Sequence, residues 1–318
     1  MVNKKLMENK RLAIVIPAYK ASYFRQALDS INNQTCKDFT LYIGDDCSPY
    51  NLGEIVEAYE ENISIVYKRF DENIGGKNLV DHWNRCIDMV KNEDYIWFFS
   101  DDDKMEENCV ADFYQALISV GEKDLFHFNV QVIDEKNHVI EPVAYRKKPF
   151  PSFMTQTEYI KGRLNFQLNS FVVEYIFKKN RFEEVGRFQK FDLAWGTDDA
   201  TWMKMAAKNG IHTIETSKVF WRLSSENISP NKNHDILIRK MNSTLNFLIF
   251  IKKYISFKEL DKSCFNYWLH SMWNACASLQ KQEVLSLNKN FRKAFKVSAY
   301  NQLKLDILCG FRILLKKD

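Results

Sequence analysis

The sequence predicts an α/β fold with a mostly parallel central sheet, followed by a helical C-terminal region. Three observations support this prediction. Short apolar runs alternate with amphipathic stretches of helical spacing in the first part of the chain. The connections between them are short, which is typical of βαβ units. Of the 318 residues, 46% are apolar, which is enough for a large core. Together these features predict a Rossmann-like α/β/α sandwich.

Composition narrows the classes of function. The formal net charge of +4 is too small to predict nucleic-acid binding by the molecule as a whole. The seven cysteines are scattered without a CxxC pair, which is typical of reduced thiols in a cytoplasm. The N-terminal stretch MVNKKLMENKR lacks the apolar core of a signal peptide. The longest apolar stretch, 245–251, is far shorter than the roughly 20 residues of a membrane span, so we expect a soluble, cytoplasmic protein.

The predicted elements begin with a strand at 12–16, a β-branched run that ends at Pro17. Apolar residues at helical spacing predict a helix over 22–33, with Ser22 as its N-cap. The same two patterns continue along the chain. Further strands are predicted at 39–44, 63–67, 95–99 and 124–132, and further helices at 52–61, 76–90 and 107–120.

The middle of the chain has a different pattern. Residues 142–156 carry three prolines and predict a loop. The elements predicted after it are a strand at 171–177, a helix at 198–209 and a strand at 219–223. The remainder is helical in pattern. We therefore predict a boundary near residue 232, with an α/β domain over 1–232 and a helical region over 233–318.

Polar or conformationally unusual residues follow the ends of the first four predicted strands. These are Pro17-Ala18-Tyr19, Asp45-Asp46, the NIGGK loop (73–77) and Asp101 to Asp103. Ligands of open parallel sheets bind at the carboxyl ends of the strands. We therefore expect all four groups to lie along one rim of the sheet.

The run Asp101-Asp102-Asp103 directly follows an apolar strand. Two unit charges about 4 Å apart repel by about 4 kcal/mol at an effective dielectric of 20. A divalent cation would offset that repulsion, and oxygen ligands favour Mg²⁺, Mn²⁺ or Ca²⁺ over zinc. A solvated acidic turn that caps the next helix explains the run equally well. Asp45 and Asp46, expected at the same rim, favour the cation.

Two other features also have a functional and a plain structural interpretation. Tyr19 follows the end of a strand and could stack on a base, or it is an ordinary surface tyrosine. The loop 73–77 offers backbone amides and Lys77 to a diphosphate, or it is simply a tight turn.

Asp198 and Asp199 begin a predicted helix after a Trp-Gly pair. Acidic residues in a first helical turn commonly serve only the helix dipole. An aspartate in this position could also act as a general base, which contributes about 10²–10⁴ in rate. Both aspartates stay candidates for this role.

With these residues assembled, roughly residues 10–230 resemble the family 2 glycosyltransferases, inverting nucleotide-sugar-dependent enzymes with the GT-A fold. The stretch LAIVIPAYKASYFRQALDSINNQTCKDFTLYIGDDCS is similar to the start of that family. NIGGKNLVDHWNRCI resembles its Asn-x-Gly loop and the following helix. YIWFFSDDD resembles its metal-binding DxD segment, and TDD at 197–199 resembles the acidic pair with the catalytic base.

The resemblance implies a role for individual residues. Tyr19 would stack on the nucleotide base, and Asp45 would form a hydrogen bond with the pyrimidine ring. Asp102 would ligate a cation that bridges the diphosphate. The implied nucleotide contacts are Pro17, Ala18, Tyr19, Asp45, Asp46, Gly75, Lys77, Asn84 and Asp101. The implied ligands of a divalent cation, Mn²⁺ or Mg²⁺, are Asp101, Asp102 and Asp103. Asp198 or Asp199 would deprotonate the acceptor hydroxyl. Against the family pattern, spacing to Gly210 favours Asp199 and spacing to Lys204 favours Asp198.

The sequence departs from the family pattern around the cation. Phe99 stands where the family often has an aspartate, two positions before Asp101. Either the Asp101-x-Asp103 frame or the Asp101-Asp102 pair would then hold the metal. The family histidine that follows a Tyr-Arg pair is absent before His234. The sequence therefore does not identify a third protein ligand for the metal.

The predicted function is inverting transfer of a sugar from a nucleotide diphosphate donor, a UDP-sugar, to a hydroxyl acceptor in surface polysaccharide or glycan synthesis. The expected partners are that donor and a saccharide or lipid-linked glycan acceptor, without nucleic acid. A metal-dependent phosphohydrolase is one alternative, although Met105 stands where that class has Thr or Val. A glycosidase, which needs two carboxyl groups on either side of a sugar bond, is a further alternative. A nucleotide-sugar-binding module without turnover is the non-enzymatic alternative.

The last segment, 288–318, has eight Lys or Arg residues against two acids, interleaved with apolar residues. This pattern predicts a helix packed on its own domain with a solvated basic face. It also fits a segment that lies on an anionic membrane surface, which would make the protein peripheral at the inner face of the membrane.

Overall fold

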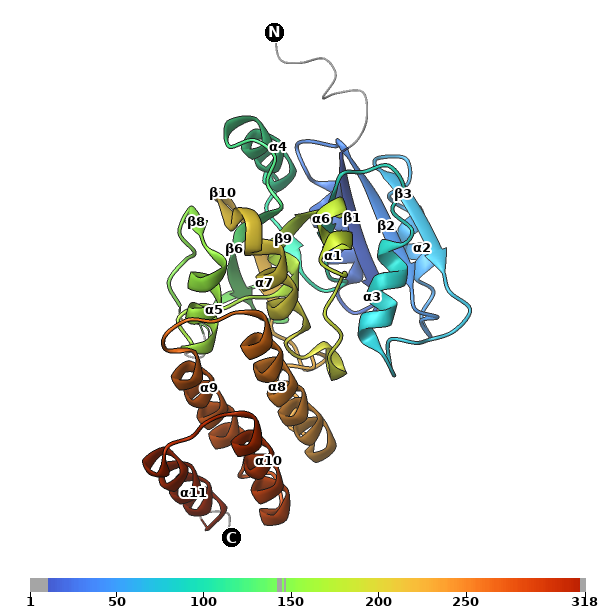
Figure 1. Cartoon of the computed structure of the whole chain (residues 1–318). Coiled ribbons are helices and arrows are strands. Elements are labelled where there is room, and N and C mark those ends of the chain that lie inside the picture. The colour runs from blue at the N-terminus through green and yellow to red at the C-terminus, as the bar shows by residue number, and fades with distance from the viewer. Residues whose placement is uncertain (1–10, 142–144, 146, 315–318) are drawn as a thin grey trace.

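The computed structural model describes residues 11–141, 145 and 147–314, with the side chains of 311–314 left aside. The polar N-terminal stretch 1–10 and residues 142–144 of the predicted loop lie outside this part of the chain. In Figure 1 a twisted sheet occupies the upper half of the molecule, and the last four helices form a group at the opposite end.

The described strands form one sheet in the order β3-β2-β1-β4-β9-β6-β10-β5. Short strands β7 and β8 pair with β6 and β10 outside this path. The strands are β1 (Leu12–Ala18), β2 (Phe39–Asp45), β3 (Ser64–Arg69), β4 (Tyr95–Phe98), β5 (Lys104–Met105), β6 (Leu125–Ile133), β7 (Val139–Ile140), β8 (Phe153–Met154), β9 (Tyr175–Lys178) and β10 (Ile211–Arg222).

Helices lie on both faces of this sheet and beyond its end. They are α1 (Phe24–Asn32), α2 (Leu52–Glu57), α3 (Leu79–Ile87), α4 (Cys109–Ser119), α5 (Gln156–Leu164), α6 (Lys179–Glu184), α7 (Thr197–Asn209), α8 (His234–Tyr254), α9 (Leu260–Ala275), α10 (Lys281–Ala294) and α11 (Ala299–Leu314). Two 3₁₀ turns, η3 (Val172–Glu174) and η4 (Asp192–Ala194), precede β9 and α7.

The longest strand pairings are parallel: β1 with β2, β2 with β3, and β6 with β10. β9 runs antiparallel to both β4 and β6 and joins the two parallel parts. The predicted α/β sandwich with a mostly parallel sheet and a helical C-terminal region is therefore confirmed.

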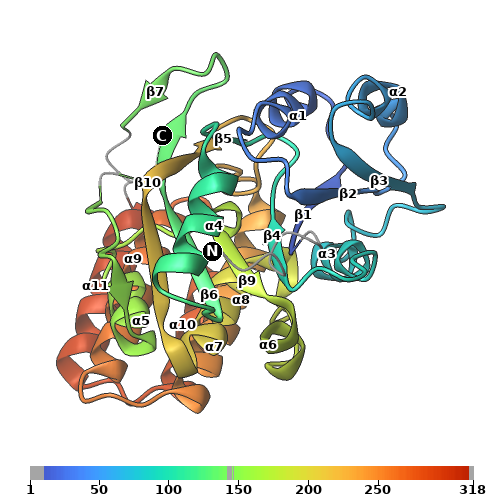
Figure 2. The ribbon, with the colours of Figure 1, turned by 90° about the horizontal axis from the view of Figure 1, so that it is seen from above.

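Alternate residues of β1 enter two separate cores, which explains why this strand is apolar throughout. Leu12, Ile14 and Ile16 pack with α1, α2 and α4 on one face of the sheet. Ala13 and Val15 pack on the other face with α3, α7 and the C-terminal helices. Figure 2, seen from above, shows α1 and α2 on one side of β1–β3 and α3 on the other. A strand buried on both faces is typical of parallel sheets with two helical layers.

The C-terminal helices pack on the α/β part of the chain. α8 lies against α7 and the η4 turn, and α9 lies against α5. Within the helical group, Trp268 of α9 stacks on Phe291 of α10 at 4.9 Å and donates a hydrogen bond to Asn288. The boundary predicted near residue 232 falls in the segment between β10 and α8. In the described part of the chain, no helix has the length and hydropathy to cross a membrane.

Two predicted strands differ from the structure. The strand predicted at 171–177 starts only at Tyr175, because Val172–Glu174 form a turn whose Val173 carbonyl accepts a hydrogen bond from Trp97. The strand predicted at 219–223 is β10, which already begins at Ile211. Its first half, IHTIETSK, is too polar to show as a core strand, and the pairing with β6 is interrupted between Ile214 and Lys218.

Candidate active site

The loops after β1, β2 and β4 meet at one rim of the sheet. The Asp101 carboxylate accepts hydrogen bonds from the backbone amides of Tyr19 and Lys20, at 3.0 and 2.8 Å. On the other side, the Asp46 amide donates to the carbonyl of Ala18 at 2.9 Å. The turn after β1 is therefore fixed by the ends of both neighbouring strands, and the predicted groups do lie together.

Asp45 is fully buried at the end of β2, with three donors around its carboxylate. The Ser48 amide donates to Oδ1 at 2.7 Å, and the Tyr67 hydroxyl and Arg69 guanidinium donate to Oδ2 at 2.6 and 2.9 Å. Burial, followed by the Asp45 charge, raises the pKa of Tyr67. Asp45 thus faces protein groups on every side, and the half-exposed Arg69 is the most exposed member of this cluster.

Asp46 shapes the loop 73–77. Its carboxylate accepts hydrogen bonds from the amides of Ile74 and Gly75, at 3.0 and 2.9 Å, and pairs with the Arg85 guanidinium. A Cβ atom on residue 75 would collide with this carboxylate, so the close approach requires glycine. Burial lowers the pKa of the neighbouring His82 to about 4, which keeps its imidazole neutral at pH 7.

The other predicted nucleotide contacts differ in their exposure. Tyr19, with 41% of its surface exposed, and the exposed Lys77 are open to a ligand. Ala18 is buried, and its neighbour Pro17 is part of the pairing of β1 with β2. Asn84 lies on α3, where its side-chain oxygen is buried and has no hydrogen-bond partner among the described residues. Of these predicted contacts, the Tyr19 and Lys77 side chains are therefore the ones that a ligand can reach from solvent.

The three consecutive aspartates divide into a pair and a single residue. Asp101 and Asp102 are each 5% exposed and share the Lys20 ammonium, which pairs directly with Asp102 and lies 3.4 Å from Asp101 Oδ1. Asp103 instead accepts a hydrogen bond from the Arg222 amide at 2.7 Å. Burial raises the pKa values of Asp101 and Asp103. Burial alone would lower the pKa of Lys20, but the two carboxylates raise it, so the ammonium stays charged.

The aspartate pair fits a divalent cation better than the triplet does. Among the described residues, no group of three or more His, Cys, Asp or Glu side chains is arranged to hold a metal ion. Oxygens of Asp101 and Asp102 nevertheless converge on one position, where the Lys20 ammonium lies. Magnesium commonly takes one or two carboxylates and completes its shell with phosphate oxygens and water. His234 pairs with Glu283 at 3.0 Å and is not part of this cluster.

The acidic pair at the start of α7 has two different environments. Asp199 is buried, and the Arg163 guanidinium donates to both of its oxygens, at 2.7 and 2.9 Å. The Tyr159 hydroxyl donates to the same carboxylate at 2.8 Å. Asp198 is half-buried and lines a cavity. Its enclosure by protein, together with the adjacent charge of Asp199, raises the pKa of Asp198 to about 7.

The turn before α7 is strained and is held by α8. Leu193 and Ala194 have φ values of 56° and 53°, a region that costs non-glycine residues free energy. Gly196 follows with φ 84° as the N-cap of α7. Ser243 of α8 donates a hydrogen bond to the carbonyl of Trp195 at 2.9 Å. The C-terminal helices thus help to place Asp198, a contribution that no motif in the sequence indicated.

The cavity beside Asp198 has a volume of about 350 Å³. Six aromatic side chains contribute to its wall: Trp83, Tyr145, Phe171, Trp195, Trp221 and Tyr267. Trp83 and Leu79 belong to α3, directly after the loop that Asp46 holds. Trp221 precedes Arg222, whose backbone holds Asp103. The cavity therefore extends from the start of α7 to the neighbours of the aspartate rim.

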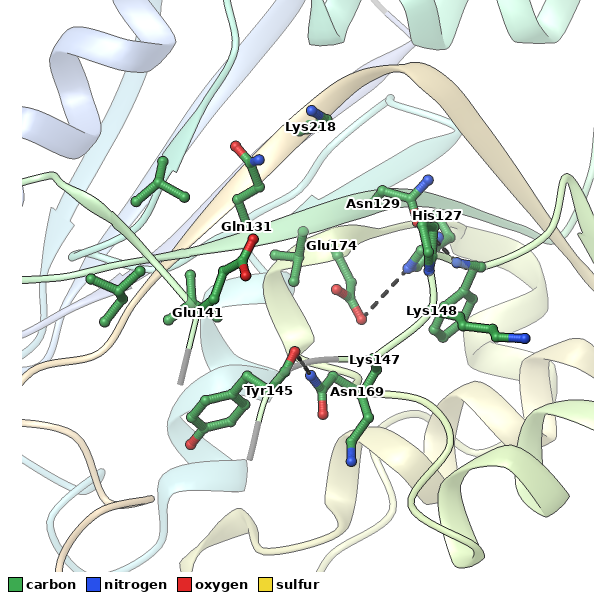
Figure 3. Close-up of a pocket in the computed structure, with 16 residues that line it drawn as sticks. His127, Asn129, Gln131, Glu141, Tyr145, Lys147, Lys148, Asn169, Glu174 and Lys218 are labelled. Carbon is green, nitrogen blue, oxygen red and sulfur yellow. Dashed lines mark hydrogen bonds and ion pairs between the residues drawn. The ribbon is translucent and has the colours of Figure 1, made fainter. Parts of the chain in front are cut away.

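A second cavity of about 700 Å³ adjoins the first and shares Tyr145 and Asn169 with it. Its wall includes β6, where His127 lies 3.6 Å from Glu174. Figure 3 shows the polar side chains around this space, with Lys147 and Lys148 extending in different directions from its edge. None of the site residues predicted from the sequence lines it, because the segment around 142–156 carries no motif.

Other residues of the site were also missed in the sequence. Lys20, Arg69, Arg163 and Arg222 hold the carboxylates described above. Lys20 and Arg69 stand close in sequence to predicted site residues or strand ends, which is a weak signal. Arg163 lies 36 residues before Asp199, and only the packing of α5 against α7 brings the two together.

A sequence model of glycosyl transferase family 2 matches residues 13–179, more than half of the chain. The chain belongs to this family. The matched segment contains the aspartates at the ends of β2 and β4 and the loop 73–77. The resemblance stated from the motifs is therefore confirmed.

Curated relatives of the chain include other members named as glycosyltransferases. An uncharacterized glycosyltransferase of Rickettsia typhi is 26% identical over 209 residues, which are 63% of this chain and 60% of that protein. The abequosyltransferase RfbV of Salmonella typhimurium is 28% identical over 106 residues, 31% of this chain and 30% of the relative. The chain thus spans less than two thirds of the length of these relatives.

Solved structures confirm the GT-A fold. TarS of S. aureus, residues 1–349 in complex with UDP-GlcNAc, matches with a TM-score of 0.56 and 14% identity, over 93% of this chain and 90% of that one. The mannosyltransferase PcManGT from Pyrobaculum calidifontis, in complex with GDP-Man and Mn²⁺, matches with a TM-score of 0.52 and 13% identity, over 98% and 89%.

Replacing Arg163 with methionine is expected to lower the free energy of unfolding by about 3 kcal/mol, because Asp199 is then buried without its charged partner. Urea denaturation measures the change. Asp198→Asn is the matched control, since Asp198 forms no ion pair with any described residue. This substitution is expected to change the free energy of unfolding by less than about 1 kcal/mol. Equal stability of the Arg163 variant and the wild type would contradict a charge-dependent role for this pair.

Proposed function

We propose that the chain transfers a sugar from a nucleotide diphosphate donor to an acceptor hydroxyl, with inversion at the anomeric carbon. The observation that supports this most directly is the position of Asp198. It lines a cavity whose wall continues to the aspartate rim, and its pKa is raised to about 7. A general base is most effective when its pKa lies near the working pH.

In the proposed donor complex the nucleotide lies along the rim, at the ends of β1, β2 and β4. The exposed Tyr19 stacks on the base, and Lys77 contacts the diphosphate. Because Asp45 is covered by Tyr67 and Arg69, we assign the contact with the pyrimidine ring to Arg69, oriented by Asp45. A divalent cation held by Asp102 with Asp101 would neutralise charge on the diphosphate when bound.

In the proposed reaction the acceptor enters the cavity of about 350 Å³ beside Asp198. The Asp198 carboxylate takes the proton of the acceptor hydroxyl, and the oxygen attacks the anomeric carbon from the face opposite the diphosphate. The bond between that carbon and the phosphate oxygen breaks, and the nucleoside diphosphate leaves. Asp199 is held by Arg163, and after burial it is the second cause of the raised pKa of Asp198.

We further propose a UDP-sugar as donor and a saccharide or lipid-linked glycan of surface polysaccharide synthesis as acceptor. A glycan longer than one residue would continue from the Asp198 cavity into the adjoining cavity of about 700 Å³, past Tyr145 and Asn169. Membership in glycosyl transferase family 2 favours this function over a phosphohydrolase. A binding module without turnover is the second candidate, and the next experiment separates the two.

Asp198→Asn is expected to lower the rate at which the sugar is released from its nucleotide by about 10²–10⁴, because the amide cannot accept the proton. Release of UDP or GDP from a panel of nucleotide sugars, with Mn²⁺, measures the rate, and calorimetric titration with UDP measures binding. Binding is expected to be unchanged in the variant. Donor binding by the wild type without any sugar release would favour the binding module, and release of phosphate from simple esters would favour a phosphohydrolase.

The pH dependence of kcat/KM is expected to follow Asp198. As a base it must be ionised, so the rate rises about tenfold per pH unit below its pKa of about 7 and levels off above it. In Asp198→Asn the residual rate is expected to lose this rise. A wild-type profile that is flat between pH 5 and pH 8 would contradict the assignment of the base.

We also propose that α11 lies on an anionic membrane surface. Its inner face packs through the buried Leu305 and Cys309. Its outer face carries Tyr300, Leu303 and Ile307, which are 75%, 59% and 57% exposed. These three residues recur at helical spacing, and the segment 288–318 has a strong excess of basic residues. An exposed apolar face flanked by lysines is typical of helices that bind in the interface of anionic bilayers.

The membrane proposal predicts that the protein sediments with vesicles that contain phosphatidylglycerol and much less with neutral vesicles. Leu303→Asp combined with Ile307→Asp is expected to weaken this binding at least tenfold. Ile118→Asp on α4, where the side chain is also 59% exposed, is the matched control and is expected to have no effect. Unchanged sedimentation of the double variant would contradict the proposal, as would a dimer that the double variant abolishes in the absence of vesicle binding.

A further inference from the structure

The Lys20 ammonium lies at the position in the aspartate rim where a divalent cation would bind. Its ammonium pairs with Asp102 and lies 3.4 Å from Asp101 Oδ1, so one positive charge lies where the two carboxylates converge. Both carboxylates are buried, and a buried charge without a counter-ion is strongly unfavourable. In the described structure the Lys20 ammonium is the cation that offsets this pair.

The Lys20 side chain is not needed to hold the turn on which it lies. The amides of Tyr19 and Lys20 fix this turn by hydrogen bonds to Asp101, and these bonds do not involve the side chain. The Lys20 side chain is 28% exposed, and a flexible stem of four carbons carries its ammonium group. It can therefore swing toward solvent or toward a bound anion while the backbone stays in place.

The other nearby cation cannot take over this role. The Arg222 guanidinium donates to the carbonyls of Asp102 and Asp134, and to the side chains of Gln26 and Asn137. Four of its N–H donors are thus used on oxygens other than the carboxylates of Asp101 and Asp102. Once Lys20 leaves, the pair of carboxylates needs a cation from solution.

We propose that Lys20 is a built-in counter-ion that excludes a free divalent cation from Asp101 and Asp102 until a nucleoside diphosphate is bound. A metal ion and an ammonium cannot share this position, because like charges a few ångströms apart repel. The diphosphate offers the ammonium an alternative anionic partner and offers the metal further oxygen ligands. Metal and nucleotide therefore bind with positive coupling, and each increases the affinity of the other by the same factor.

This inference rests on the proposed function, since it assumes a diphosphate at the rim, and it is tested by binding rather than by turnover. Electron paramagnetic resonance of free Mn²⁺, recorded with and without UDP, measures the Mn²⁺ affinity. Wild type is expected to bind Mn²⁺ weakly alone and at least tenfold more tightly with UDP. Lys20→Met is expected to bind Mn²⁺ at least tenfold more tightly than wild type without UDP and to lose most of the gain from UDP.

Two further variants separate charge from structure. Lys20→Arg keeps the positive charge, so its Mn²⁺ affinity without UDP is expected to stay weak. Lys208→Met removes a lysine that pairs with Glu184 on the surface, and Mn²⁺ binding is expected to match wild type. Circular dichroism confirms that each variant is folded.

The inference is overturned if Lys20→Met binds free Mn²⁺ no more tightly than wild type. It is also overturned if wild type binds Mn²⁺ equally well with and without UDP, or not at all under either condition. Its failure is distinct from failure of the proposed function, because sugar release by the wild type is measured separately. Sugar release together with unchanged Mn²⁺ binding in Lys20→Met would reject only the role of Lys20.

Discussion

The structure depends on the neutralisation of carboxylates that are buried where parallel strands end. A buried, unpaired carboxylate is strongly unfavourable, so each aspartate at the rim needs a specific donor or counter-ion. Asp45 has Arg69 and Tyr67, Asp46 has Arg85 and two loop amides, and Asp101 has the amides of the turn after β1. These bonds connect the turn after β1 and the loop 73–77 to β2 and β4. The conformation of the rim loops therefore depends on the hydrogen bonds and ion pairs that the buried aspartates require.

The same constraint separates the two aspartates of α7. Asp199 has a guanidinium and a hydroxyl as partners, which hold its carboxylate in place. Among the residues that the structure describes, Asp198 has no comparable partner, and enclosure by protein and the neighbouring charge raise its pKa to about 7. The difference between the held carboxylate and the proposed base therefore lies in Arg163, which α5 supplies, and in the strained turn that α8 supports. Helices outside the sheet thus set the different environments of the two aspartates.

The sequence predicted the parts of this site that depend on strand ends. Apolar runs located β1, β2 and β4, and the polar residues that follow them lie on one rim because parallel strands share their carboxyl end. Spacing could not show whether Asp198 or Asp199 is the open carboxylate, since the answer depends on Arg163 from a distant helix. The first half of β10 was missed because its residues are polar and it pairs through an irregular register. Lys20 was not recognised because a lysine after a turn has no pattern of its own.

The central claim is that Asp101 and Asp102 hold a cation next to a donor diphosphate, in the same cleft as Asp198. Anomalous diffraction at the manganese absorption edge, from crystals grown with UDP and Mn²⁺, tests it most directly. We expect one strong peak, from a Mn²⁺ ion that contacts Asp102, Asp101 and the diphosphate. The Lys20 side chain is expected to be turned away from the two carboxylates. A peak elsewhere, or a nucleotide bound on a surface that does not connect to the Asp198 cavity, would contradict it.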